Sequence, residues 1–152
     1  LYKALIRPHL EYCSTVVYPR TKAQLKSVKG VQRRVTKLVS ELRDKPYDER
    51  LRSLALPSMK YRLRRGDMIQ IWKILHNKYS VEVCTLPIAS TITRGHPLPL
   101  EKTRCITNTR LLTFPHRAVN DWNALPSHVV TATSFKNALD KEWKQFIYVY
   151  DQ

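Results

Sequence analysis

Glycine is scarce in this chain of 152 residues, with only Gly30, Gly66 and Gly95 present. The dinucleotide fingerprint G-x-G-x-x-G and the phosphate-binding P-loop each need several closely spaced glycines, so both classes of nucleotide-binding enzyme are excluded. Long hydrophobic runs are also missing, because no apolar stretch approaches the ~20 residues that span a bilayer. The chain starts with LYKAL, without an initiator Met or a signal-peptide pattern. We therefore expect an internal part of a longer protein, with no membrane partner.

Cysteine is limited to Cys13, Cys84 and Cys105, an odd number at wide spacing with no C-x-x-C pair. Disulfide frameworks use even sets of cysteines in oxidising compartments, so the pattern predicts free thiols and a nuclear or cytoplasmic setting. A zinc site could be drawn from Cys84, His96, Cys105 and His116. Their gaps lack the closely spaced ligand pairs that make zinc motifs specific. We expect no metal site.

Acidic residues are few, 12 against 27 basic ones, and they are scattered along the chain. Polymerases and nucleases that use two metal ions need clustered carboxylates to hold those ions ~4 Å apart. The only adjacent acidic pair is Asp48 and Glu49. Both lie at the start of a predicted helix, where negative side chains are favoured by the positive end of the helix dipole. A Ser/His/Asp or Cys/His site stays open, since such partners meet only in space. No residue is assigned as catalytic and no cofactor is expected in this chain.

The positive charge is concentrated in one region. Fifteen basic and four acidic residues lie between positions 20 and 65, so this segment carries +11 of the total formal charge of +15. Clustered charge of one sign attracts a polyanion such as nucleic acid. The alternative interpretation is a solvated face that only keeps the protein soluble.

Residues 22–42 have the spacing of an amphipathic helix, with Thr21 as its predicted N-cap. Five cations, here called the basic stripe, fall within about 80° of one another on that helix: Lys22, Lys26, Lys29, Arg33 and Lys37. Apolar residues occupy the other side: Leu25, Val28, Val31, Val35, Leu38, Val39 and Leu42. A pure basic stripe opposite an apolar face predicts a helix that packs on one side and presents cations on the other.

Helices are also predicted for most of the remaining segments. Helices are predicted in the opening stretch on both sides of Pro8, at 47–54, at 58–77 with Ser58 as cap, around 119–122 and after a capping Ser134. Trp72 lies in the apolar half of the 58–77 helix and is predicted to be core. Residues 84–99 are predicted to be a loop, and 105–112 a short strand or extended segment.

These predictions define a mainly α fold. We expect an N-terminal basic helical bundle at residues 1–77, a loop-rich linker at 78–99 and a small C-terminal helical module at 100–152. Further candidate nucleic-acid contacts are Arg34, Arg62, Arg64 and Arg65 in the bundle and Arg94, Lys102, Arg104, Arg110 and Arg117 beyond it. The second group is the weaker assignment, because no regular helix aligns it.

Several blocks of sequence resemble one family in order and spacing. They are residues 1–13 (LYKALIRPHLEYC), 31–37 (VQRRVTK), 65–69 (RGDMI), 93–96 (TRGH), 104–105 (RC), 122–126 (WNALP) and 135–140 (FKNALD). Together they resemble the region downstream of the catalytic palm in jockey-like non-LTR (LINE) retrotransposon reverse transcriptases. The resemblance covers nearly the whole chain.

The resemblance implies that residues 1–77 correspond to the polymerase thumb and the rest to the family's C-terminal extension. It also implies that the Mg²⁺-binding carboxylates belong to a palm domain upstream, which would be a partner of this region. The expected function is non-catalytic: gripping RNA, an RNA–DNA hybrid or DNA through phosphates, without reading bases. The alternative is a basic helical protein-interaction module that binds an acidic partner.

Overall fold

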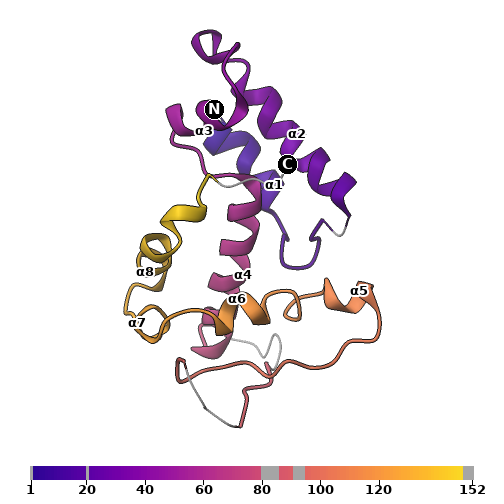
Figure 1. Ribbon diagram of the computed structural model, residues 1–152, viewed down its shortest axis with the longest axis vertical. Coiled ribbons are helices and arrows are strands. Elements are labelled where there is room, and N and C mark those ends of the chain that lie inside the picture. Colours follow the sequence, from indigo (N-terminus) through magenta and orange to yellow (C-terminus); the bar gives the residue numbers. More distant parts are fainter. Residues whose placement is uncertain (1, 20, 80–85, 91–94, 149–152) are drawn as a thin grey trace. The chain divides into compact units, whose positions relative to one another are not determined.

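The computed structural model describes residues 2–19, 21–79, 86–90 and 95–148 (Figure 1). Within these residues every regular element is a helix, and the only β pairing is a single antiparallel bridge between Ile88 and Leu100. The predicted mainly α fold class is therefore confirmed. In the described part of the chain, no helix combines the length and the apolar character that crossing a membrane requires.

The chain divides into two compact units, one formed by Leu1–Leu63 with Gln145–Gln152 and the other by Arg64–Lys144. The first unit holds a π-helical turn at Tyr2–Ile6, then α1 (Arg7–Glu11), α2 (Lys22–Thr36), a 3₁₀ turn at Ser40–Leu42, α3 (Tyr47–Ser53) and the start of α4 (Met59–Leu75). Its core gathers Tyr2, Tyr47, Leu51 and Leu56, with Tyr148 packed against them. The backbone N–H of Ser58 donates to Ile147 O at 2.9 Å, which ties the returning C-terminal segment to this unit.

Helix α2 begins where the sequence predicts and ends earlier. Thr21 forms a reciprocal capping box with Gln24, as the predicted N-cap requires. The helix stops at Thr36 instead of continuing to residue 42, so the prediction of its end was wrong. The physical reason lies in the last turn, where Lys37 N–H donates to Arg34 O and Leu38 N–H to Val35 O, bonds of the tighter 3₁₀ type. Leu38 is consequently 77% exposed instead of packed.

The other N-terminal helices follow the prediction more closely. Helix α3 falls on the predicted 47–54 segment, and α4 is capped as expected because Tyr61 N–H donates to the Ser58 hydroxyl at 3.3 Å. Pro8 lies in the first turn of α1, directly after the π-helical turn at Tyr2–Ile6, so the chain changes from π-helix to α-helix next to the proline. The helix predicted after Pro8 ends at Glu11, and residues 12–17 form no helix, so three side chains expected on its apolar face are exposed: Tyr12, Val16 and Val17.

The second unit contains most of α4 together with α5 (Asn108–Leu111), α6 (Val119–Asn123), α7 (Ser127–Val130) and α8 (Phe135–Glu142). Its core centres on Trp122, which is fully buried and lies 5.9 Å from the Phe135 ring. Other fully buried side chains come from α4, α7 and α8: Met68, Ile71, Val129, Val130 and Leu139. The predicted helix that Pro126 limits is therefore present as α6, and Pro126 leads directly into α7.

Two predictions for this unit were wrong. The extended segment expected at 105–112 contains helix α5, because the Thr107 hydroxyl accepts from Arg110 N–H and starts a helical turn. Ser134 precedes α8 as predicted, but its side chain makes no capping hydrogen bond, and its carbonyl accepts from Asn137 and Ala138 N–H instead. Of the predicted 84–99 loop, residues 86–90 and 95–99 are described and contain no helix.

Candidate nucleic-acid interface

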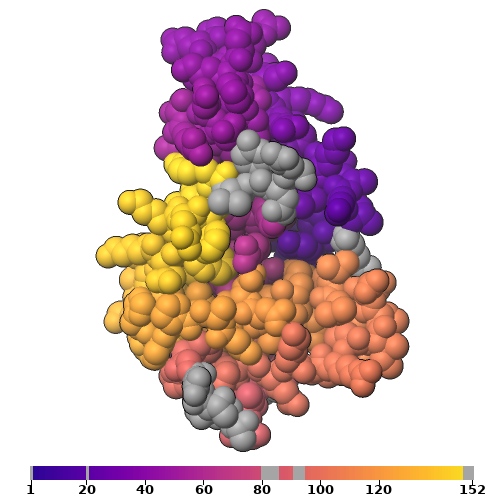
Figure 2. All heavy atoms as spheres, in the orientation of Figure 1, coloured from indigo at the N-terminus to yellow at the C-terminus, as the bar shows by residue number. Residues whose placement is uncertain are grey.

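The basic stripe lies along one side of α2. Because α2 rises about 1.5 Å per residue, the stripe extends over about 22 Å, with a cation roughly every 5 Å. Lys22, Lys26, Arg33 and Lys37 are exposed and Lys29 is half-buried, while Arg34 is exposed on a neighbouring face of the helix. Residues 22–36 contain no acidic side chain. In Figure 2 the indigo and purple atoms of the N-terminal segment form part of the molecular surface.

Four of the cations on α2 and at its C-terminal end have no carboxylate partner in the described part of the chain. Among the residues that the structure describes, no salt bridge joins Lys22, Lys26, Arg34 or Lys37 to an acidic side chain. Lys22 occupies the first turn, where the positive end of the helix dipole disfavours a cation, and that turn contains no acidic residue. This charge arrangement is unfavourable for the isolated helix and favourable toward an external anion.

A buried hydrogen-bond network fixes how α2 is rotated. Gln32 is 1% exposed, and its side-chain amide donates to Pro57 O at 3.0 Å and accepts from the Tyr47 hydroxyl at 2.7 Å. The Arg33 guanidinium lies over the Tyr47 ring, 5.0 Å from its centroid. Helix α2 packs against α3 at this point (Figure 1).

The most buried side chains of α2 are therefore Gln32 and Thr36, whereas Leu25, Val28, Val31 and Val35 are only half-buried. Hydrophobic periodicity does not reveal this anchor, because glutamine is a polar residue. A buried amide is stable only when its groups are paired, and the partners here come from α3 and from Pro57, distant in sequence. The anchor holds the basic stripe on the side of α2 that does not carry Gln32.

Four of the candidate arginines lie against carboxylates. Arg62 binds Glu11 through two hydrogen bonds of 2.7 and 2.6 Å, and Arg64 binds Asp121 in the same bidentate way at 2.8 and 2.7 Å. Arg65 pairs with Asp140, and Arg117 pairs with Asp67 at 2.9 and 2.7 Å. Because the planar fork of each guanidinium already faces a carboxylate, these four side chains stabilise the fold and are left out of the interface proposed below.

Arg117 and Asp67 form the most buried of these pairs, with side chains 8% and 5% exposed. Burial raises the pKa of Asp67, and the Arg117 guanidinium acts in the opposite direction. The Arg117 guanidinium also donates from Nη1 to Leu112 O at 3.1 Å, so it joins α4 to the segment before α6. We assign Arg117 a structural role within the second unit.

The remaining members of the second basic group do not form a regular array. Lys102 and Arg104 are exposed in a segment without helix, and Arg110 is exposed on α5. Arg94 lies outside the described residues. The cations of α2 thus lie along one helix, whereas the described members of the second group do not share a helix.

His96, one of the two histidines in the candidate zinc set, already has hydrogen-bond partners at both ring nitrogens. Leu98 N–H donates to His96 Nδ1 at 3.2 Å, which leaves the proton on Nε2, and Nε2 donates to Trp122 O at 3.0 Å. Burial lowers the pKa of His96, in agreement with a neutral ring. Cys84 lies outside the described residues. Across the parts of the chain that are described, no group of three or more His, Cys, Asp or Glu side chains is placed to hold a metal ion.

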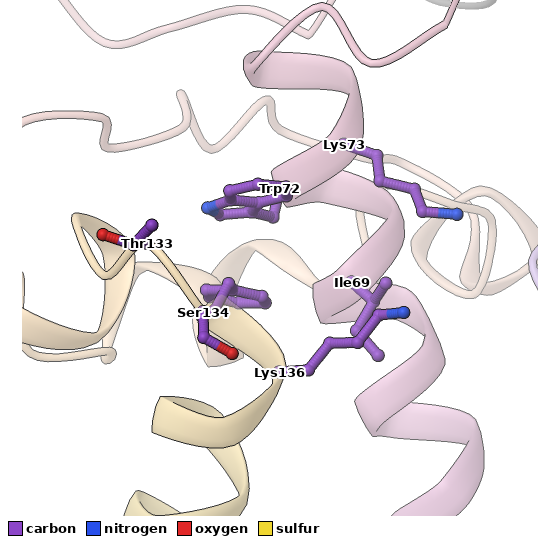
Figure 3. A pocket seen from close by; sticks show the side chains of 7 residues that line it. Ile69, Trp72, Lys73, Thr133, Ser134 and Lys136 are labelled. Carbon is purple, nitrogen blue, oxygen red and sulfur yellow. The ribbon is translucent and has the colours of Figure 1, made fainter.

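A hollow of about 180 Å³ opens in the second unit between α4 and the start of α8 (Figure 3). Its lining residues are Ile69, Trp72, Lys73, Thr133, Ser134, Phe135 and Lys136. Figure 3 shows the indole nitrogen of Trp72 pointing toward Thr133 and both lysine amines on the opposite side. The Trp72 ring stacks on His76 at 4.3 Å and on Phe135 at 5.6 Å between ring centroids. Trp72 is half-buried at the wall of this hollow and is not one of the buried core residues that the prediction expected, although its ring packs within the unit.

Comparison of the chain with protein-family models, with curated proteins and with solved structures finds no match. The family resemblance therefore depends on the sequence blocks quoted above. The physical argument for function depends on the cations of α2 and on the network that orients them.

Proposed function

We propose that this chain is a non-catalytic, nucleic-acid-binding region of an RNA-directed DNA polymerase, and that it holds the template–primer duplex through phosphate contacts. The observation that carries the proposal is α2, a helix of fifteen residues with five cations and no acidic side chain. The choice of polymerase comes from the resemblance to jockey-like reverse transcriptases. In that assignment Mg²⁺ and the chemistry belong to the palm domain of the same polymerase.

The geometry of α2 suits recognition that is independent of sequence. A helix with cations roughly every 5 Å can follow a phosphate backbone, and the stripe carries no aromatic or amide side chains that would read bases. An RNA–DNA hybrid offers a wide, shallow minor groove bordered by phosphates and sugar hydroxyls. Contacts of this kind would limit dissociation of the polymerase between nucleotide additions.

The test compares two variants with the same loss of charge. In the first, all five residues of the basic stripe are changed to Gln: Lys22, Lys26, Lys29, Arg33 and Lys37. In the second, five exposed cations outside α2 are changed to Gln: Arg43, Lys45, Arg52, Lys141 and Lys144. Both proteins keep a formal charge of +10, because each loses five of the original +15.

Binding to an RNA–DNA hybrid hairpin is measured by fluorescence anisotropy for the wild type and both variants. We expect the stripe variant to lose most of its affinity and the control variant to bind within a few fold of the wild type. Equal losses would mean that only net charge matters, and the proposal would fail. Competition with polyglutamate of equal charge separates the alternative function, since an acidic-protein module would be displaced as readily by polyglutamate as by duplex.

A further inference from the structure

Arg50, on α3, is a buried charged side chain whose Nε and Nη1 atoms have no hydrogen-bond partner. It is 3% exposed, and both of these atoms are enclosed. Asp48 and Glu49 precede it on the same helix, yet within the described residues neither forms a salt bridge with it. A buried charge that is not paired is strongly unfavourable. Arg50 therefore differs from the four arginines that face carboxylates.

The position of Arg50 in the sequence explains its burial. Tyr47, Leu51 and Leu54 lie at helical spacing on the packed face of α3, and Arg50 lies about 40° from Leu54 at the edge of that face. The sequence analysis overlooked it because a single arginine inside a basic segment carries no distinguishing pattern. Only the fold shows that its guanidinium is enclosed.

Arg50 shares an aromatic ring with the basic stripe. The guanidinium carbon of Arg50 lies 5.8 Å from the centroid of the Tyr47 ring, and that of Arg33 lies 5.0 Å from the same centroid. The ring partly compensates both cations, but it supplies no hydrogen-bond acceptor for either fork. Two guanidinium groups, one from α2 and one from α3, thus contact the same ring where the two helices pack, and Arg33 belongs to the exposed stripe.

We propose that Arg50 and Arg33 form a binding site for one phosphate of a nucleic-acid backbone, next to the basic stripe on α2. The inference rests on the proposed function, because it takes the phosphate to belong to the strand that the stripe holds. A guanidinium fork matches two phosphate oxygens in a bidentate geometry. In this site the exposed fork of Arg33 supplies the bidentate pair, and the phosphate contacts Arg50 at Nη2, because Nε and Nη1 are the enclosed nitrogens.

The first experiment measures thermal unfolding of the full chain as wild type, Arg50→Met and the control Arg52→Met. Arg52 lies two residues away on the exposed side of α3, so the control removes the same charge without opening the buried site. Each protein is melted in chloride and in inorganic phosphate at equal ionic strength. We expect Arg50→Met to melt at or above the wild-type temperature in chloride, because an unpaired buried charge has been replaced by an apolar side chain.

In phosphate, we expect the melting temperature of the wild type and of Arg52→Met to rise, and that of Arg50→Met to rise less. An anion that binds only the folded site stabilises it by mass action. Equal rises in all three proteins would overturn the site. A failure of Arg50→Met to fold would also overturn it, since the guanidinium would then have a partner that the folded chain requires.

The second experiment measures hybrid affinity across a salt series for the same three proteins. Losing one phosphate contact should lower the slope of log affinity against log salt by about 0.7–0.9 for Arg50→Met. The affinity itself should fall at least about tenfold, as expected for a hydrogen-bonded charge. Arg52→Met should keep the wild-type slope. An unchanged slope for Arg50→Met would contradict the proposed site.

The two experiments separate the site from the function. The wild type could bind no nucleic acid and still gain more in melting temperature from inorganic phosphate than Arg50→Met does. The proposed polymerase function would then fail, and an anion site on α3 would remain. If hybrid binding depends on the stripe while Arg50→Met behaves like Arg52→Met in both experiments, the phosphate site at Arg50 fails and the function of α2 remains.

Discussion

Replacing Lys22 by Glu should stabilise the folded chain and weaken its hold on nucleic acid. Lys22 occupies the first turn of α2, immediately after the Thr21 cap, and that turn has no acidic residue. Removing a cation and adding an anion at a helix N-terminus each contribute typically 0.3–1 kcal/mol, so Lys22→Glu should raise the free energy of unfolding by about 1 kcal/mol at low salt. Lys22→Gln should give roughly half of this gain.

The assay for stability is urea unfolding followed by far-UV circular dichroism. Trp72, Trp122 and Trp143 all belong to the second unit, so tryptophan fluorescence reports that unit and serves as the internal control. Hybrid affinity of Lys22→Glu should fall, because one phosphate contact is replaced by a repulsion. A variant that loses stability would refute the electrostatic reasoning about α2. A variant that gains stability and keeps its full affinity would refute the placement of Lys22 at the nucleic acid.

Three further changes test the fold. Tyr47→Phe removes the hydroxyl that donates to the buried Gln32 amide and should cost about 1–3 kcal/mol in urea unfolding. Arg117→Met leaves Asp67 as a buried unpaired carboxylate and should cost about 3–5 kcal/mol, measured by tryptophan fluorescence. His96 has a lowered pKa, so the folded state binds fewer protons than the unfolded state. Its contribution to stability is complete above pH 6.5 and is lost below it, by up to about 1.4 kcal/mol per pH unit, and His96→Gln should remove this slope.

For each of these three variants, one result would contradict the prediction. A neutral Tyr47→Phe variant would mean that water or another donor satisfies Gln32. An Arg117→Met variant as stable as the double variant Arg117→Met with Asp67→Leu would mean that the Asp67 carboxylate is not penalised by burial. An unchanged slope between pH 6.5 and lower values in His96→Gln would assign that slope to other groups.

Local features of the structure could be predicted from the sequence, because their causes are local. The Thr21 and Ser58 hydroxyls each accept a hydrogen bond from the backbone N–H three residues later, and each helix begins directly after its capping residue. The period of hydrophobic residues placed α3 and the apolar half of α4 correctly. The end of α2 could not be predicted, because the apolar period continues past Thr36 while the backbone turns away.

Pairings between distant residues could not be read from the sequence. The arginines of α4 were expected at the nucleic acid, yet their carboxylate partners come from positions 51 to 75 residues away. A clue was available: three arginines and no acidic residue stand in the first two turns of a helix whose later turns are apolar. Arginine is the cation best suited to bidentate pairs at partly buried sites, so such a helix end indicates ion pairs as much as phosphate contacts.

The central claim is that the cations of α2 bind phosphates, and the salt dependence of hybrid binding tests it most directly. If most of the five stripe residues each neutralise one phosphate, log affinity of the wild type should fall by about 3.5–4.5 for a tenfold increase in salt. The stripe variant should lose most of that slope, and the variant with five cations removed outside α2 should keep it. A wild-type slope near zero, or an equal slope in the stripe variant, would contradict the claim and assign α2 to solvent or to a protein partner.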